Sequence, residues 1–195
     1  MALPPVGRQA LLGAKPPADV MYRPVVLRGT WVAQHTIFLD NRQMNGKPGF
    51  YVVTPLQLEG SSSAVLVERG WVQRNFVDRE KLPAVQTPRG VLELRGRMAP
   101  PPAKLYEFAG TPSGPIRQNL DLAQWRAETG LALLDVAVRQ LGEPSDGLLR
   151  DWPEAGSGAE KNYGYAFQWW ALSGLIAILY VWFQFIAPRR KAIHA

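Results

Sequence analysis

Residues 165–187 read YAFQWWALSGLIAILYVWFQFIA, a run without a charged side chain. As an α-helix, 23 residues would measure about 35 Å, enough to cross a hydrocarbon layer about 30 Å thick. Trp169 and Trp170 stand near one end of the run and Trp182 toward the other, as interfacial aromatic residues do. A helix in a soluble core would have to be apolar all round and then end in Pro-Arg-Arg-Lys. We therefore predict a transmembrane helix over residues 163–187.

The charges around this run predict its orientation. Residues 189–191 read Arg-Arg-Lys, whereas residues 151–161 carry more acidic than basic side chains. By the positive-inside rule, residues 188–195 form a cytoplasmic basic tail, or a matrix tail in a mitochondrion. The domain before the helix then lies outside, in the periplasm of a bacterium.

The start of the chain contains no obvious export signal. Residues 1–20 hold no apolar run long enough for a signal peptide or a first transmembrane helix. Either the start has been trimmed or misassigned, or the topology is unusual, and we favour the first explanation. The same residues lack the Arg- and Ser-rich amphipathic pattern of a transit peptide, which favours a bacterial inner membrane over a mitochondrial one.

Composition limits the class of protein. A chain of 195 residues has room for one ordinary domain and an attachment. The absence of cysteine excludes disulfides, thiolate nucleophiles and thiolate metal sites. The net charge of +6 comes mostly from scattered single arginines, whereas a nucleic-acid-binding surface clusters basic residues with aromatic ones. We therefore expect no nucleic-acid partner.

The middle of the chain reads as short strands separated by Gly, Pro and Asn. Six segments are rich in Val, Leu, Ile and aromatic residues, with partial alternation of period two. These predicted strands are residues 23–32, 36–41, 50–58, 64–72, 91–98 and 131–139. Turn residues at 45–49 and 59–63 make residues 36–72 a three-stranded meander. We predict an α+β chain: a mostly antiparallel β domain, barrel- or sandwich-like, with one short helix and a C-terminal transmembrane helix.

The short helix is expected over residues 121–128, with Asp121 as its N-cap and Gly130 as its stop. Residues 100–115 form a proline-rich excursion. The domain boundaries that follow are an N-terminal extension over 1–20, an external β-rich domain over 21–142 and a polar linker over 143–162.

The sequence offers poor material for catalysis. His35 and His194 are the two histidines, and neither has a second ligand at metal-binding spacing. The serines at 61–63 lie in a turn without a nucleophile elbow or an obvious base. We expect no enzyme activity, no catalytic residues and no metal site.

Arg69 is the most informative polar residue. In a strand over 64–72 it shares one face with Val65, Val67 and Trp71. A charge in an apolar stripe needs a partner, because an unpaired buried charge costs several kcal/mol. An internal ion pair, for instance with Asp40 or Glu93, is one interpretation. A docking or anion-binding arginine is the other.

Several blocks of sequence, in this order and spacing, resemble the surfeit-locus protein family (Surf/Shy type). They are YRPV at 22–25, NR at 41–42, GKPGF at 46–50, VTPL at 53–56, VLVERGWV at 65–72, LRG at 94–96 and YAFQWW at 165–170. The resemblance implies a membrane assembly factor for haem-copper cytochrome oxidase, acting where haem A is placed in the catalytic subunit. It also implies two transmembrane helices that enclose one external domain.

The resemblance further implies partners and site residues. The partners would be the oxidase catalytic subunit, haem A synthase and the lipid bilayer. Candidate partner- or anion-binding side chains are Arg69, Trp71, Arg42 and Arg23, and the candidate partner face of the helix comprises Tyr165, Trp169 and Trp170. A membrane-tethered envelope scaffold or ligand-binding module, unrelated to respiration, is the alternative function.

Two positions depart from the family pattern. Asn162 stands where members often carry a histidine discussed as a haem ligand, and asparagine is a very poor iron ligand beside imidazole. No resident cofactor is therefore expected, and a transient contact with haem A is the most that the resemblance implies. Glu68 replaces the usual asparagine before Arg69 and is expected to add a negative charge beside that arginine.

Overall fold

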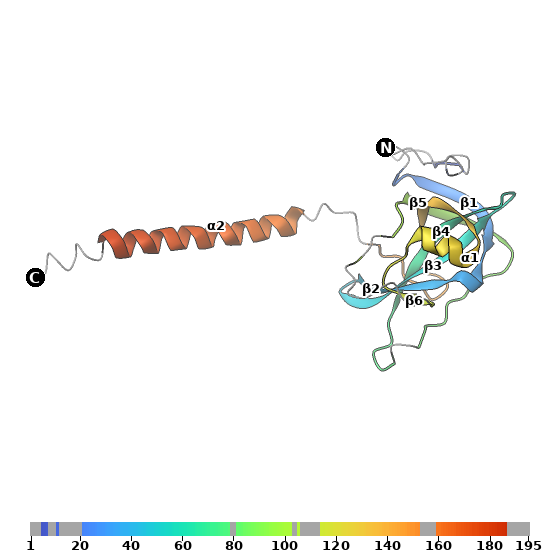
Figure 1. The fold of residues 1–195 in the computed structure, drawn as a ribbon, viewed down its shortest axis with the longest axis horizontal. Helices are drawn as coiled ribbons and strands as arrows, with labels where there is room; N and C mark the ends of the chain where they lie inside the picture. Colours follow the sequence, from blue (N-terminus) through green and yellow to red (C-terminus); the bar gives the residue numbers. More distant parts are fainter. Residues whose placement is uncertain are drawn as a thin grey trace, which may run out of the picture. The chain divides into compact units, whose positions relative to one another are not determined.

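A computed structural model describes residues 5–7, 11, 21–78, 81–102, 105, 114–152 and 159–186, the side chains of the last range from 163 to 184. Two compact units are present: a β-barrel unit that ends at Trp152, and a second unit that contains a long helix (Figure 1). The predictions for residues 188–195, and for most of 1–20 and 103–113, fall outside the described residues.

Seven strands form one sheet. They are β1 (Pro24–Trp31), β2 (Ile37–Met44), β3 (Lys47–Leu58), β4 (Ser63–Gln73), β5 (Val91–Ala99), β6 (Ile116–Arg117) and β7 (Ala132–Gln140). Their order in the sheet is β1-β5-β7-β4-β3-β2-β6. An additional pairing of β1 with β3 closes strands β1, β5, β7, β4 and β3 into a barrel. Pairings β4–β7 and β2–β6 are parallel, and the others are antiparallel. The predicted β-rich fold class is confirmed, and the barrel is the form it takes.

Local sequence signals account for several element ends. The β2–β3 hairpin turns at Asn45 and Gly46, which both have positive φ (51° and 73°) as a tight hairpin turn requires. β3 then begins at Lys47, so the turn is shorter than predicted. Helix α1 (Leu122–Thr129) is capped as expected: Asp121 accepts hydrogen bonds from two backbone amides, and Gly130 ends the helix at φ 67°.

Three buried apolar clusters stabilise the unit, and the two largest lie on opposite faces of the sheet. Inside the barrel, buried residues from all five closing strands pack together, among them Leu27, Val67, Leu94 and Val138. Leu11 of the N-terminal extension is fully buried in the same cluster. Outside the barrel, the short helix η3 (Ala33–His35) leads into β2, and Trp125 of α1 covers a second cluster on β2, β3, β4 and β7. The barrel is therefore filled on the inside and covered on one outer side.

β4 carries a β-bulge within the family-like block. Val52 of β3 pairs with Gly70 of β4, and the next residue, Val53, pairs with Glu68. Arg69 is thus an extra residue between two successive pairs, and a bulge of this kind breaks the regular alternation of the strand.

The bulge changes the face on which Trp71 lies. Val67 belongs to the cluster inside the barrel, and Arg69 reaches that cluster by stacking over Trp31. Trp71 pairs with Tyr51, which packs on the outer cluster, and cross-strand partners share a face. The prediction that Trp71 and Arg69 share one face is therefore wrong, because the extra residue reverses the alternation beyond it.

The barrel unit extends ten residues beyond the predicted start of the linker. Residues 143–152, which we name the strap, belong to this unit rather than to a free linker. Leu148 is 1% exposed, and Leu149 pairs with Trp71 through two backbone hydrogen bonds of 2.7 and 2.8 Å. The polar composition of the strap concealed its attachment to β4.

Helix α2 (Ala159–Val181) continues into one π-helical segment, η4 (Trp182–Ile186). Its stretch Tyr163–Gln184 is long and apolar enough to cross a membrane, and none of it is buried against the rest of the described chain. A helix that is apolar all round and uncovered requires lipid or partner helices around it. The predicted apolar C-terminal helix is present over nearly the predicted residues.

Candidate functional site

The Arg69 side chain holds the strap from inside the barrel. It is fully buried and lies over the Trp31 ring, with its guanidinium carbon 4.7 Å from the ring centroid. The guanidinium donates to Thr87 Oγ1 at 2.8 Å, to the Gln86 carbonyl at 2.6 Å and to Asp146 Oδ2 at 3.2 Å. Two segments distant in sequence are thus fixed to one side chain.

Electrostatics agree with this structural role. Burial lowers the pKa of Arg69, while the hydrogen bond that Arg69 donates to Asp146 opposes that change, and a guanidinium stays charged at any ordinary pH. The internal ion pair predicted for Arg69 is present, but its partner is Asp146 of the strap. Asp40 instead faces Arg74, at 3.4 Å.

The residues after Arg69 complete the attachment. The Gly70 α-carbon faces the strap so closely that a Cβ there would lie 2.7 Å from Leu148 Cβ and 2.7 Å from the Leu149 carbonyl oxygen. Arg150, itself nearly buried, donates from Nε to the Arg69 carbonyl at 2.9 Å. Each residue of the Arg-Gly-Trp block therefore contacts the strap in its own way. Arg69 pairs with Asp146 through its guanidinium, Gly70 lets Leu148 approach because it has no side chain, and Trp71 pairs with Leu149 through the backbone.

Trp71 and Arg42 are also mostly enclosed. Trp71 is 3% exposed and donates from Nε1 to the Arg42 carbonyl at 2.9 Å. The Arg42 guanidinium donates to the Gln118 carbonyl at 3.2 Å and faces the Tyr51 ring, and burial lowers its pKa. Arg23 is half-buried. Direct contact of a partner with Arg69 or Trp71 would require the strap to move, and the partner-binding role of all four side chains stays a prediction.

A stack of side chains closes the end of the strap, and we had not predicted it. The Arg139 guanidinium lies over the Trp152 ring at 4.8 Å and donates to Glu68 Oε2 at 2.7 Å. Trp152 meets Tyr51 edge to face at 5.1 Å. Glu68 thus pairs with Arg139 across the sheet, so its charge is balanced there. The expectation that it acts beside Arg69 does not describe its main contact.

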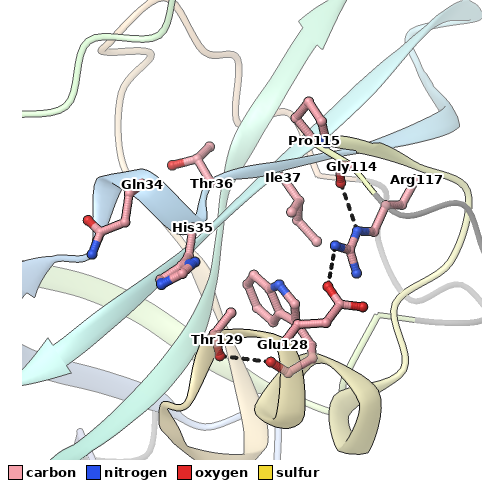
Figure 2. A pocket seen from close by; sticks show the side chains of 10 residues that line it. Gln34, His35, Thr36, Ile37, Gly114, Pro115, Arg117, Glu128 and Thr129 are labelled. Carbon is pink, nitrogen blue, oxygen red and sulfur yellow. Dashed lines mark hydrogen bonds and ion pairs between the residues drawn. The ribbon is translucent and has the colours of Figure 1, made fainter.

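One pocket lies between η3, the start of β2 and α1 (Figure 2). Its volume is about 240 Å³, and its lining combines apolar and polar side chains. These are Gln34, His35, Thr36, Ile37, Gly114, Pro115, Arg117, Trp125, Glu128 and Thr129. Figure 2 shows Arg117 and Glu128 joined by an ion pair, of 2.5 Å, and Arg117 also donates to the Gly114 carbonyl at 2.8 Å.

The chemistry available to this pocket is limited. Its volume lies below the roughly 300–1,000 Å³ of ordinary cofactor pockets. Its charged groups already satisfy one another, and among the described residues no three His, Asp or Glu side chains form a group that could hold a metal ion. The pocket can accept a small group, but a porphyrin does not fit.

The ion pair at this pocket should make the free energy of unfolding depend on pH in the acid range. The hydrogen bond from Arg117 lowers the pKa of Glu128. A carboxyl whose pKa falls on folding contributes stability above its unfolded pKa and loses it as pH falls through the lower folded pKa. Glu128→Gln should therefore lower the unfolding temperature at pH 7, and its difference from wild type should shrink below about pH 4. Thermal unfolding from pH 7 downward, with Glu93→Gln as the exposed control, measures this, and a pH-independent difference would contradict it.

The third candidate surface lies on α2. Tyr165, Trp169 and Trp170 are 65%, 69% and 78% exposed. Trp169 and Trp170 line a shallow groove together with Ala166 and Ser173. Small residues beside large aromatic ones allow another helix to approach closely within a membrane. The predicted partner face is thus available for contact, although its role stays a prediction.

The described residues thus form a small closed β-barrel, followed in the same chain by a helix that is able to span a membrane. The model of the SURF1 family matches residues 1–174. The chain therefore belongs to the SURF1 family, and the resemblance inferred from the sequence blocks is confirmed.

Two curated relatives support the assignment. A SURF1-like protein of Drosophila melanogaster is 27% identical over 197 aligned residues, which cover 88% of this chain and 61% of the fly protein. The cytochrome oxidase assembly protein SHY1 of Saccharomyces cerevisiae is 34% identical over 59 residues, which cover 30% of this chain and 15% of the yeast protein. The chain thus spans less than two thirds of the length of each.

Proposed function

We propose that this chain is a membrane-anchored assembly factor for haem-copper cytochrome oxidase, which assists haem A insertion or stabilises the catalytic subunit. The observation that carries the proposal is the family match over residues 1–174. The yeast relative, named as a cytochrome oxidase assembly protein, points the same way. The proposed partners are the catalytic subunit and haem A synthase.

The proposed mechanism is contact within the membrane rather than catalysis. The exposed aromatic side chains of α2 would pack against a membrane subunit, because helices associate in lipid through close packing and interhelical contacts. The barrel would supply a rigid external domain, since its strap is fixed to β4 at both Arg69 and Trp71. The location that we propose is a bacterial inner membrane, with the barrel in the periplasm and the C-terminus in the cytoplasm.

We propose that the described residues hold no resident haem. His35 is the one histidine among them, and its pocket is too small for a porphyrin. Position 162, where family members often carry a histidine, is asparagine. Haem A would then be cargo that is delivered to the oxidase.

A reduced-minus-oxidised absorption spectrum of membranes with and without the gene tests the proposal. Loss of the a-type haem band, with the b- and c-type bands intact and recovery on re-expression, is the expected result. An unchanged a-type band would refute the oxidase role. The barrel would then be a tethered scaffold or ligand-binding module, whose partners should co-purify without any oxidase subunit.

The aromatic face of α2 gives a sharper test. Trp169→Leu together with Trp170→Leu keeps the span apolar but removes both indole rings. Loss of a tryptophan that forms a hot spot of a protein–protein interface costs about 2 kcal/mol, which makes the complex roughly thirtyfold weaker. We expect the a-type band to fall while the amount of protein in the membrane stays constant. Trp182→Leu at the other end of the helix is the matched control, and equal spectra for the two variants would contradict the assigned face.

A further inference from the structure

The loop over residues 74–78 holds two apolar side chains out of the barrel. Phe76 is 62% exposed and Val77 is 98% exposed. The turn is ordered by Asn75, whose side-chain oxygen accepts hydrogen bonds from the backbone amides of Val77 at 2.9 Å and Asp78 at 3.2 Å. Isolated exposed apolar residues are normal, but an adjacent pair fixed outward by its own turn is a more specific arrangement.

Both sides of this loop are fixed to the barrel. Arg74 pairs with Asp40 at 3.4 Å, and its amide donates to the Pro48 carbonyl at 3.5 Å. After the loop, Leu82 packs against the cluster that contains Phe50. The two exposed side chains therefore project from an anchored base.

The loop lies at the same end of the barrel unit as the last residues of the strap, Asp151 and Trp152. Pro48, whose carbonyl accepts the Arg74 amide, is the second residue of β3, close to the β2–β3 hairpin turn. In that turn, Asn45 donates from its side chain to Asp151 Oδ2 at 3.1 Å. Asp151 precedes Trp152, the last residue of the barrel unit. A continuous set of contacts thus joins the loop to the strap's final residues.

The number of residues between the two units limits how far Trp152 can lie from the membrane-spanning stretch. Residues 153–162 separate the barrel unit from the span that starts at Tyr163. Six residues lie between Trp152 and the start of α2 at Ala159, so the distance from Trp152 to Tyr163 is at most about 30 Å. An exposed aromatic and aliphatic pair at a membrane surface gains by burial in the interfacial layer.

We propose that Phe76 and Val77 insert into the interface of the bilayer that holds α2, and that lipid is the partner of this loop. The barrel then has a second attachment besides its tether, and two attachments restrict its orientation over the membrane. This proposal depends on α2 spanning a membrane but not on the oxidase role. Lipid insertion of the loop and the oxidase assembly role can therefore be refuted separately.

The absence of cysteine makes single-site labelling direct. The full chain carrying Val77→Cys is labelled with an environment-sensitive fluorophore and reconstituted into vesicles of phosphatidylethanolamine and phosphatidylglycerol. Ser62→Cys, at an exposed turn between β3 and β4, is the matched control. We expect the probe at position 77 to show blue-shifted emission, quenching by nitroxide-labelled lipid and a severalfold lower quenching constant with iodide than the probe at position 62.

Two outcomes would overturn the proposal. One is equal iodide quenching at positions 77 and 62, with no quenching by nitroxide lipid. The other is protection of position 77 from iodide in native membranes but not in lipid vesicles that contain no other protein, which would assign the loop to a protein partner. Neither outcome bears on the a-type haem band, which tests the oxidase role alone.

Discussion

Replacing Arg69 with methionine should lower the free energy of unfolding by about 3 kcal/mol, since removal of one partner leaves the other charge of a buried pair uncompensated. Methionine fills much of the volume but donates to neither Thr87 nor the Gln86 carbonyl. Asp146 would keep only the more distant Arg150 guanidinium, at 3.8 Å. For a domain of this size the unfolding temperature should fall by roughly 6–12 °C, measured on the full chain in detergent by near-UV circular dichroism.

Two further variants separate a structural role of Arg69 from direct partner binding. Lysine at this position keeps the charge but lacks the planar fork that reaches three acceptors, so it should recover only part of the stability. Adding Asp146→Asn to Arg69→Met removes the uncompensated charge, and asparagine tolerates the positive φ of 59° at that position. The double variant should therefore be more stable than Arg69→Met alone.

The matched control is Arg95→Met, because the Arg95 side chain is 81% exposed and its carboxylate neighbour is 3.9 Å away. Its effect should stay within about 0.5 kcal/mol. Partner binding as the main role of Arg69 would give a different result: Arg69→Met would unfold at the wild-type temperature, yet the a-type haem band would be lost.

Local patterns were sufficient to predict most strands but not their closure. Alternating apolar residues and turn residues are properties of a few neighbours, so the strands, the capped helix α1 and the apolar span followed from short windows of sequence. The pairing of β1 with β3, which closes the barrel, joins Gly29 to Leu58, and strand β2 lies between them in the sequence. β6 is two residues long and exists only because β2 lies beside it.

The attachment of the strap was missed for a related reason. Residues 143–152 contain glycine, proline and charged residues, a composition typical of linkers. Leu148 packs against Gly70, and Arg150 donates to the Arg69 carbonyl, so the partners that bury them lie about 80 residues away in sequence. The family-like blocks were recognised as a signature, yet their physical relation is visible only in space: Gly49-Phe50-Tyr51 pairs across the sheet with Trp71-Val72-Gln73.

The close approach of Gly70 to the strap leads to the second large effect that we expect. In Gly70→Ala the new methyl group would lie 2.7 Å from both Leu148 Cβ and the Leu149 carbonyl oxygen, so the strap must move away. The Trp71–Leu149 backbone pair would open and Leu148 would lose its packing, at a cost of about 2–3 kcal/mol. Hydrogen exchange followed by mass spectrometry should show faster exchange in residues 143–152, while β1 and β5 stay protected.

Gly7→Ala, with no atom within 4 Å of its Cβ, is the matched control. Unchanged protection of the strap in Gly70→Ala would show that the Arg-Gly-Trp block does not hold it.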